Sequence, residues 1–253
     1  MKQKNLIEKF HIPTFIVVVI LIILWWLASL KFGRYLLPTP SSVLSGLVNI
    51  VISGVIWKHV LSTLFRIILG FIFAIIASLI FILLAHKWKN AKIVIKDFNS
   101  ILNSFSVFVW IVLALIWFGI TDSAAIFTTL MITLPILLSN LLEGLEHIDK
   151  RFLEVGSVYK FSKLDEFRNI ILPSLFPSFI GGMRAGFGLG LKISVVAEMF
   201  GVTTGIGYIL NYSREILATD MVFVWAIILI LIMILIDKLI FETLTKKVKK
   251  WQY

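Results

Sequence analysis

Residues Ile12–Leu30 read IPTFIVVVILIILWWLASL, a run without a single charged side chain. A helix needs about 20 mostly apolar residues to cross the hydrocarbon core of a bilayer, and this run has that length. It is too long and too rich in tryptophan for a cleaved signal peptide, and no small-residue cleavage site follows it. The run therefore predicts a transmembrane helix.

The composition of the whole chain agrees with this interpretation. Hydrophobic residues make up 59% of the 253 positions and charged residues only 15%, whereas soluble domains have about 45–50% and about 25%. Because a soluble domain must cover its surface with polar groups, this composition nearly excludes a soluble enzyme or a disordered chain. The absence of cysteine excludes disulfides, thiol chemistry and Cys-ligated metals. We expect neither a metal nor a cofactor.

Five more apolar stretches follow the first, so the sequence predicts an all-α, polytopic membrane protein with about six transmembrane helices. The expected spans cover residues 12–30, 60–85, 93–120, 123–142, 172–200 and 221–241. Polar residues interrupt the third and the fifth of them. We expect all six to belong to one domain, residues 1–253.

The net charge of +10 is compatible with nucleic-acid binding or with cationic cytoplasmic loops. The placement of the charges decides between the two. Sixteen lysines and arginines lie in the N-terminus, residues 86–96, residues 143–170 and the C-terminus, and only four lie in the alternate loops. By the positive-inside rule this asymmetry places both termini in the cytoplasm. Nucleic acid is then not needed to explain the charge, and we expect no such partner.

Two connections between the spans differ in character. The outer loop 31–59 contains Pro38 and Pro40, which are expected to break any helix and to favour an extended surface segment. In the cytoplasmic loop 143–171, apolar residues recur at helical spacing. Ser162-Lys-Leu-Asp165 has the Ser-x-x-Asp form of a helix start. The loop therefore predicts two short amphipathic helices that end at Pro173.

The stretch Glu154–Pro173 reads EVGSVYKFSKLDEFRNIILP. It resembles the cytoplasmic loop of ABC importer permeases, whose pattern is Glu-Ala-Ala, a Gly four residues after the second Ala, and a final Ile-x-Leu-Pro. Glu154 and Ile170–Pro173 keep the residues and their spacing, whereas Val155-Gly156 replaces the alanine pair and Lys160 replaces the glycine. The resemblance implies that the loop forms a coupling helix that docks on an ATPase subunit. The alternative is an amphipathic loop that lies on the lipid surface.

Other motifs extend the resemblance to the permeases of nitrate, sulfonate and taurine importers. They are Leu37–Ser41 (LPTPS), Ile116–Gly119 (IWFG) with Asp122-Ser123, Gly182–Arg184 (GMR), Ala197–Met199 (AEM), Gly205–Tyr208 (GIGY) and Thr219-Asp220. They occur in collinear order between residues 36 and 240. In one respect the chain departs from this group, which often carries prolines early in the third span. Residues 99–111 of this chain contain none.

The resemblance implies a permease subunit in the bacterial inner membrane. Such a subunit pairs with a second copy of itself, is driven by two cytoplasmic ATPase subunits and receives its solute from an extracytoplasmic binding protein. Nitrate, sulfonates, taurine and vitamin precursors are all open as substrates. The residues implied in ATPase coupling are Phe152, Glu154, Val155, Gly156, Tyr159, Lys160, Leu172 and Pro173.

The fifth span carries a stripe of small residues, one every four positions: Gly182, Gly186, Gly190 and Ser194. Small residues at this spacing let two helices approach closely in lipid, so the stripe predicts helix packing. A dinucleotide-binding loop is the other interpretation of Gly186–Gly190, but the strand-to-helix context and the spacing are missing.

Charged groups also fall within the spans. Arg184, Lys192 and Glu198 lie in the fifth span, where charge in hydrocarbon is unfavourable, and they are candidates for lining an anion pathway. The alternatives are a structural ion pair or snorkelling of the side chains to the interface. Arg66, one turn into the second span, is expected to snorkel outward.

Two rival functions stand beside that of an importer permease. A channel or secondary transporter needs no ATPase and leaves the patterned cytoplasmic loop without a purpose. An intramembrane enzyme needs paired acids, or a nucleophile with a base, at membrane depth, and the sequence shows neither. The phosphate-binding loop of ATPases is also absent. We therefore expect a transport protein that is not itself an enzyme.

Overall fold

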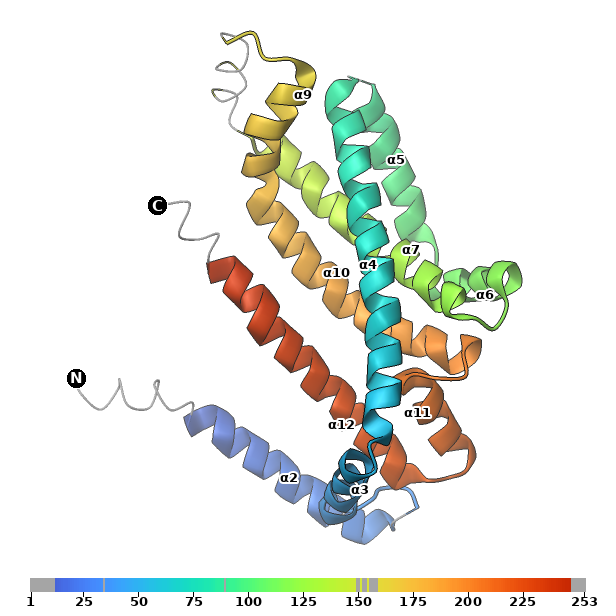
Figure 1. Ribbon diagram of the computed structural model, residues 1–253. Helices are drawn as coiled ribbons and strands as arrows, with labels where there is room; N and C mark the ends of the chain where they lie inside the picture. Colours follow the sequence, from blue (N-terminus) through green and yellow to red (C-terminus); the bar gives the residue numbers. More distant parts are fainter. Residues whose placement is uncertain are drawn as a thin grey trace, which may run out of the picture. The chain divides into compact units, whose positions relative to one another are not determined.

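The computed structural model describes residues 12–33, 35–88, 90–148, 151, 154 and 159–246, with side chains from residue 16 onward (Figure 1). This part of the chain is helical and contains no strand, which confirms the all-α prediction. The helices are α2 (Ile12–Phe32), α3 (Pro40–Ile52), α4 (Val55–Lys87), α5 (Ala91–Ser104), α6 (Val107–Phe118), α7 (Asp122–Glu146), α9 (Lys163–Glu166), the π-helical turn η1 (Phe167–Ile171), α10 (Leu172–Gly201), α11 (Ile206–Glu215), α12 (Thr219–Ile236) and the π-helical turn η2 (Asp237–Glu242).

The chain divides into two compact units. The first comprises Met1–Trp57 and Ile209–Ile228, and the second comprises Lys58–Tyr208 and Leu229–Tyr253. The second unit holds the long helices α4, α7 and α10 together with α5 and α6. Whether the whole chain acts as one domain, as the sequence suggests, stays a prediction.

Four described helices are long and apolar enough to cross a membrane: Val55–Lys87, Asp122–Glu146, Lys163–Gly201 and Thr219–Lys246. They contain the expected spans 60–85, 123–142, 172–200 and 221–241. Counting the bent pair α5 and α6 as one more span gives five. The first expected span, 12–30, coincides with α2, of which Ile16–Phe32 is described as a shorter apolar helix. The count of six therefore stays a prediction.

The expected span over residues 93–120 is not one straight helix, and whether it crosses the membrane stays a prediction. The segment consists of α5 and α6, which meet at an angle of 90°. Phe105 and Ser106 have extended backbones, with ψ of 133° and 143°, and the carbonyl of Ser106 accepts the N–H groups of Val109 and Trp110 to begin α6. Serine favours the start of a helix over its interior, because its hydroxyl competes for backbone groups. The polar interruption noticed in the sequence is thus a true break.

The expectation that the outer loop is extended around its two prolines is wrong in part. Pro40 opens α3 instead of preventing a helix, because the first helical position needs no N–H donor and favours the fixed φ of proline. The hydroxyl of Thr39 caps this helix by accepting the N–H of Ser42 at 3.3 Å. Within the first unit, Gly46 of α3 lies so close to α12 that an added Cβ would be 3.0 Å from Val224 Cγ2.

The predicted helix start at Ser162 is confirmed, since its hydroxyl accepts the N–H of Asp165 at 3.2 Å. The predicted end at Pro173 is wrong, because the helix continues without interruption from Lys163 to Gly201. The turn just before the proline is π-helical, and the N–H of Leu172 bonds to the carbonyl of Phe167. A wider turn of this kind accommodates a proline ring, which has no N–H and would clash with the carbonyl four residues earlier.

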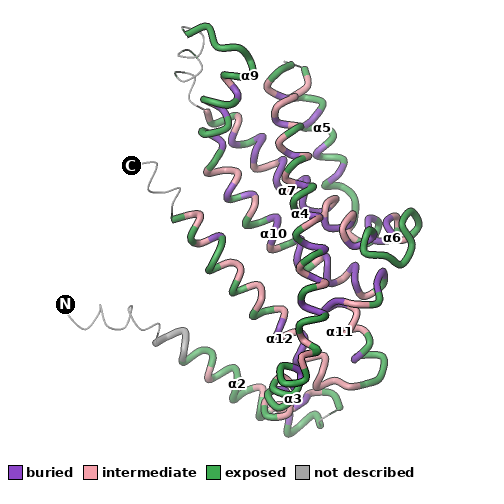
Figure 2. The backbone as a smooth tube through the Cα atoms, viewed as in Figure 1, coloured by how far each residue is buried: buried purple, intermediate pink, exposed green. Residues whose placement is uncertain are grey.

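The core of the second unit is built around α7, which packs between α4 and α10. Figure 2 shows buried positions recurring along both α7 and α10. Helix α4 approaches α7 at Gly70, where an added Cβ would lie 2.7 Å from the carbonyl oxygen of Ile126. Such close approach through glycine is typical of helix packing in lipid.

The stripe of small residues on α10 faces α7. A Cβ added at Gly182 would lie 2.9 Å from Asn140 Cβ, and one at Gly190 would lie 2.8 Å from Thr133 Oγ1. Ser194, the last member of the stripe, is fully buried. The two helices are therefore so close along this stripe that a Cβ on the glycines of α10 would press into side chains of α7.

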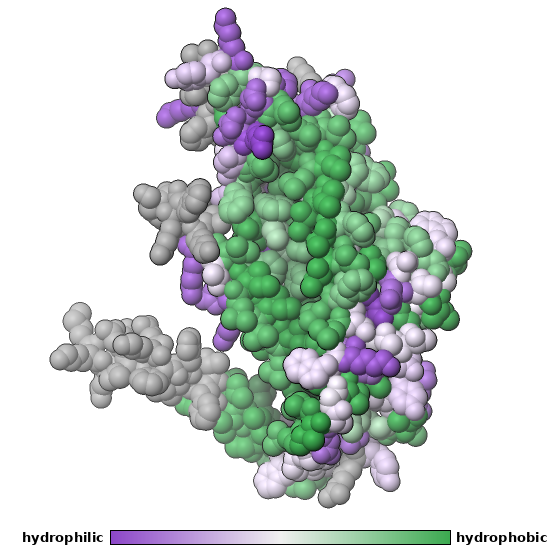
Figure 3. All heavy atoms as spheres, in the orientation of Figure 1, coloured by the Kyte–Doolittle hydropathy of each residue, from purple (hydrophilic) through white to green (hydrophobic). Residues whose placement is uncertain are grey.

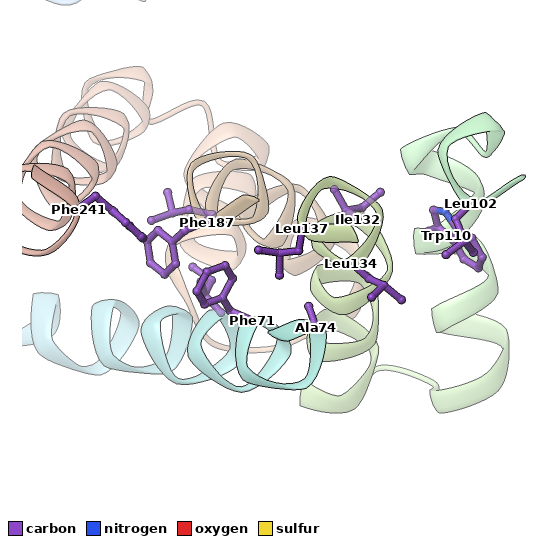
Figure 4. Close-up of a cluster of buried hydrophobic side chains, with 11 residues drawn as sticks. Phe71, Ala74, Leu102, Trp110, Ile132, Leu134, Leu137, Phe187 and Phe241 are labelled. Carbon is purple, nitrogen blue, oxygen red and sulfur yellow. The ribbon is translucent and has the colours of Figure 1, made fainter. Parts of the chain in front are cut away.

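Aromatic side chains join these helices to the C-terminal part of the chain. In Figure 4, Phe187 of α10 lies between Phe71 of α4 and Phe241 of η2. The ring centroids are 5.3 Å and 5.6 Å from that of Phe187. Other apolar side chains remain exposed, and on the face shown in Figure 3 they cover α4, whereas hydrophilic side chains gather near α9. An exposed apolar belt of this kind is what a lipid-facing surface requires.

Candidate functional site

The most highly connected polar cluster lies where α10 ends and the chain turns into α11. Helix α4 contributes Thr63 and Arg66, and α10 contributes Glu198, three residues before its last residue. Arg66 is 2% exposed and Glu198 is fully buried. Arg66 Nη1 lies 2.7 Å from Glu198 Oε1, so the two charges form a buried ion pair.

Every other polar atom of this pair also has a partner. Arg66 donates to the carbonyl and the hydroxyl of Thr204 at 2.8 and 2.6 Å, and to Asp122 Oδ1 at 2.7 Å. Glu198 Oε2 accepts the hydroxyl of Thr63 at 2.8 Å and the N–H of Gly207 at 3.0 Å. Buried charges that are paired and fully hydrogen-bonded in this way stabilise one specific arrangement of the chain.

Two glycines make room for this cluster. Gly205 has a φ of +113°, which side chains rarely adopt, and an added Cβ there would lie 2.5 Å from Glu198 Oε2. At Gly207 an added Cβ would lie 2.0 Å from the carbonyl oxygen of Val195. The motif Gly205–Tyr208 noted in the sequence is therefore a tight return of the backbone over the carboxylate.

The structure corrects the expectation for Arg66, which does not snorkel outward but holds Glu198. It also separates Glu198 from the other two candidate pathway residues, because Glu198 is enclosed by its partners. Sequence reasoning missed the pairing, although a signal existed. Arg66 lies in the first half of α4, Asp122 begins α7 and Glu198 lies near the end of α10, so alternating helix directions bring all three to one end of the bundle.

Arg184 and Lys192 lie on a different surface of α10, where they line a groove shared with α12 and η2. Arg184 forms a bidentate pair with Asp237: Nε–Oδ1 and Nη2–Oδ2 are both 2.6 Å. Lys192 is exposed, and no ion pair joins it to any described residue. The groove thus contains two cations and one anion.

The cytoplasmic loop is described at Arg151, Glu154 and from Tyr159 onward. Phe152, Val155 and Gly156, which the resemblance implies in coupling, lie outside the described residues. Glu154 and Tyr159 are exposed. Lys160 has a φ of +52°, a conformation that favours glycine. This explains in physical terms why the related pattern has glycine at this position.

The end of the loop packs against α4. Glu166 lies 3.4 Å from His86 Nε2 of α4 and 3.2 Å from Lys163 Nζ. Phe167 is buried, whereas Leu172 and Pro173 are exposed at the start of α10. Among the residues with described positions, no three acidic or histidine side chains are grouped to hold a metal ion. The arrangement is suited to mechanical transmission and to electrostatic binding of a solute.

Comparison with known proteins identifies the family. Residues 80–250, more than half of the chain, match the family described as "Binding-protein-dependent transport system inner membrane component". The aliphatic sulfonates transport permease protein SsuC of Escherichia coli (strain K12) is 39% identical over 117 residues, which are 46% of this chain and 44% of that protein. The taurine transport system permease protein TauC of the same organism is 29% identical over 140 residues, 55% of this chain and 50% of that protein.

These similarities cover about half of the length of each relative. A solved structure described as an amino acid ABC transporter with histidines superposes with a TM-score of 0.59 at 16% identity, covering 82% of this chain and 95% of that one. That likeness supports the fold alone. The sequence relatives confirm the resemblance to the permeases of sulfonate and taurine importers.

Proposed function

Because the chain belongs to the family of binding-protein-dependent transport system inner membrane components, which are transport permeases and not enzymes, we propose that it forms the translocation pathway of an ATP-driven importer. In this proposal two copies of the chain enclose the pathway, two cytoplasmic ATPase subunits drive it, and an extracytoplasmic binding protein delivers the solute. The solute is a small anion or organic molecule, in keeping with the sulfonate and taurine permeases that the chain resembles.

One structural observation supports this function above the others. The helix that begins at Lys163, beside the cytoplasmic loop, runs on without a break to Gly201. At 1.5 Å per residue its 39 residues span about 58 Å, roughly twice the hydrocarbon core. It carries the groove residues Arg184 and Lys192 on its way and Glu198 near its far end. A displacement of the loop is therefore transmitted along one hydrogen-bonded element to the pathway.

The loop itself has the features of a docking element. Tyr159 and Leu164 are 72% and 63% exposed, and both are apolar groups at the surface of the loop region. A few buried apolar anchors usually dominate the affinity of an interface. The end of the loop also packs against α4, because Phe167 lies in one apolar cluster with Ile82 and Ala85 of that helix, so a pull on the loop acts on both helices.

The mechanism follows from this connection. Binding of ATP closes the two ATPase subunits and draws the two coupling loops together. Each loop then moves its α10 as a rigid body, and the pathway between the two copies opens to the opposite side of the membrane, as alternating access requires. The chain supplies the moving helix α10 and the lining of the pathway, whereas ATP hydrolysis by the ATPase supplies the energy.

The coupling role is tested by Glu154→Lys, which we expect to abolish uptake. The carboxylate lies in the exposed loop, where it can meet basic groups of an ATPase surface, and the substitution replaces attraction by repulsion. Membrane delivery and expression should be unchanged, because the loop lies outside the spans. The measurement is the amount of ATPase that co-purifies with the permease, together with ATP hydrolysis and uptake in vesicles.

Lys160→Gly is the matched control in the same loop. Because Lys160 has a positive φ, glycine should be accepted there without strain, and we expect ATPase docking and uptake at the wild-type level. If Glu154→Lys keeps a full complement of ATPase and full coupling, the loop is not the docking element. Uptake that proceeds without any ATPase would assign the chain to channels or secondary transporters instead.

We further propose that both termini face the cytoplasm, on the charge asymmetry of the loops. A reporter that is active only in the cytoplasm should work when it is fused after Tyr253 and should fail when it is inserted near Lys58. An external reporter such as a phosphatase should give the opposite result. Activity of the cytoplasmic reporter at Lys58 would reverse the orientation and remove the loop from the ATPase side.

A further inference from the structure

The groove beside Arg184 and Lys192 is a cavity of about 560 Å³ in the second unit. Along α10 it is lined at Gly181, Arg184, Ala185, Gly188, Leu189 and Lys192, and along α12 and η2 at Met233 and Asp237. The α10 positions are three or four residues apart, so they form one continuous helical face. One wall of the groove is thus formed by α10 and the other by α12 with η2.

The charged groups of this groove lie at two depths along their helices. Arg184 is 17 residues before the end of α10 at Gly201, which corresponds to about 26 Å. Asp237 is 18 residues after the start of α12 at Thr219, or about 27 Å. Lys192 is about 14 Å from Gly201. Since the hydrocarbon core is about 30 Å thick, Lys192 lies near its middle, whereas Arg184 and Asp237 lie near its opposite boundary. A charged side chain at the depth of Lys192 needs water, a partner or a ligand, because lipid does not solvate it.

The groove carries one positive charge without a counter-charge. The bidentate contact with Asp237 neutralises Arg184 and fixes the plane of its guanidinium. Nη1 of this guanidinium has no acceptor among the described residues and remains available as a donor. Lys192, two helical turns away, is exposed and forms no ion pair in the described part of the chain. The remaining charge of the groove is therefore positive.

The groove also has free space next to the backbone of α10. A Cβ added at Gly181 would meet no atom closer than Asn140 Oδ1 at 4.0 Å, whereas one at Gly182 would lie 2.9 Å from Asn140 Cβ. At Gly188 an added Cβ would lie 3.4 Å from Met233 Cε, which is the end of a flexible side chain. Small residues therefore keep one face of the helix open to a solute, while the adjacent face is packed.

We propose that this groove is a binding site for a small organic oxyanion, such as an alkanesulfonate, with Lys192 as its counter-charge and Arg184 Nη1 as a second donor. The assignment rests on the proposed transport function and deepens it, because it names the chemistry of the solute inside the membrane. The depth of Lys192 favours a dissolved anion over the phosphate of a lipid headgroup, which stays at the membrane surface.

Because the chain has no cysteine, single cysteines test this site cleanly. The assembled importer with Gly181→Cys, in phosphatidylcholine vesicles, is treated with the anionic reagent 2-sulfonatoethyl methanethiosulfonate and with its cationic trimethylammonium counterpart. The permease mass gives the two labelling rates, each divided by the rate with a free thiol. We expect the anionic reagent to react faster. We expect Lys192→Gln to lower the anion-to-cation ratio about tenfold, since one unit charge acts nearby in a poorly screened site.

The controls separate charge, shape and location. Lys192→Arg should keep the ratio, and ethanesulfonate should slow the labelling whereas the uncharged ethyl methyl sulfone should not. Ser123→Cys, exposed at the start of α7 outside the groove, should be labelled by both reagents without any effect of Lys192→Gln. Ala185→Cys repeats the test should Gly181→Cys fold poorly.

The site would be overturned by no labelling at either groove cysteine, by equal rates for both reagents, or by a ratio that Lys192→Gln leaves unchanged. Slower labelling on addition of phosphatidylglycerol, without any effect of ethanesulfonate, would assign the groove to a lipid headgroup and also overturn it. The labelling needs neither ATP nor uptake. It can therefore fail while the loop docks the ATPase, and it can succeed while docking fails.

Discussion

Arg66→Met is expected to lower the free energy of unfolding by about 3–5 kcal/mol, because it leaves the carboxylate of Glu198 buried without its charge partner. Glu198 is fully enclosed, so water cannot replace the guanidinium. The substitution also removes the donors to Thr204 and Asp122, which hold the return from α10 against α4 and α7. The decrease in the free energy of unfolding should be larger than the decrease caused by removing any exposed ion pair among the described residues.

The measurement is the thermal unfolding of the purified importer in detergent, followed through the permease subunit. Lys246→Met is the control, since its partner Glu242 lies at the surface and an exposed pair of this kind contributes little to stability. Arg66→Met combined with Glu198→Met should recover much of the stability, because apolar residues of similar volume often replace a buried pair without loss. Unfolding of Arg66→Met at the wild-type temperature would show that the pair is not essential to the fold.

The positions of most long helices can be predicted from the sequence. A long apolar run is stable in a membrane as a helix, because the backbone groups must be hydrogen-bonded within the segment. The breaks between helices follow less well. The bend of 90° depends on the extended backbones of Phe105 and Ser106, and serine is also common inside helices of membrane proteins. The effect of a proline is also hard to predict, because proline can start a helix as well as end one. Both Pro40 and Pro173 were expected to interrupt a helix, and neither does. The first opens α3, and the second is accommodated by a π-helical turn.

The candidate site was predictable in its members but not in its pairings. The sequence shows that Arg66, Arg184, Lys192 and Glu198 lie within spans, and it contains the stripe that α10 uses for packing. It does not show which cation meets Glu198, because the partner is 132 residues away and only the order of helices in space brings it near. The ion pair of Arg184 with Asp237 was missed for the same reason.

Two faces of α10 illustrate what spacing alone leaves open. Gly182, Gly186 and Gly190 lie on one face, and Gly181 and Gly188 lie on the adjacent one. The residue type does not distinguish these glycines, but the structure does. An added Cβ on the first face would press against α7, whereas one on the second would be 4.0 Å from Asn140 Oδ1 at Gly181 and 3.4 Å from the flexible end of Met233 at Gly188. The first face fixes α10 to α7, and the second provides the groove. The same residue type thus serves close packing and solute access on one helix.

Gly186→Leu is expected to impair assembly of the folded permease without preventing its insertion into the membrane. An added Cβ at this buried position would lie 3.0 Å from Thr133 Cγ2 of α7, with Leu137 Cγ at 3.7 Å and Phe71 Cε2 at 3.8 Å. The remaining carbons of a leucine would have to displace α7 or the aromatic core. Overpacking by even a few methylene groups lowers stability by about 1–3 kcal/mol, and leucine at a helix crossing adds more volume than that.

Gly181→Leu is the matched control on the same helix, because its side chain would enter the groove, where no atom lies within contact distance of the new Cβ except Asn140 Oδ1 at 4.0 Å. Both variants carry the same loss of glycine and the same added apolar side chain, so they differ only in what the side chain meets. We expect both to reach the membrane fraction, but only Gly186→Leu to lose thermal stability in detergent and to co-purify with less ATPase. Equal stability of the two variants would mean that α10 and α7 can move apart at little cost. In that case the close contact along the stripe would not be what holds α10 against α7.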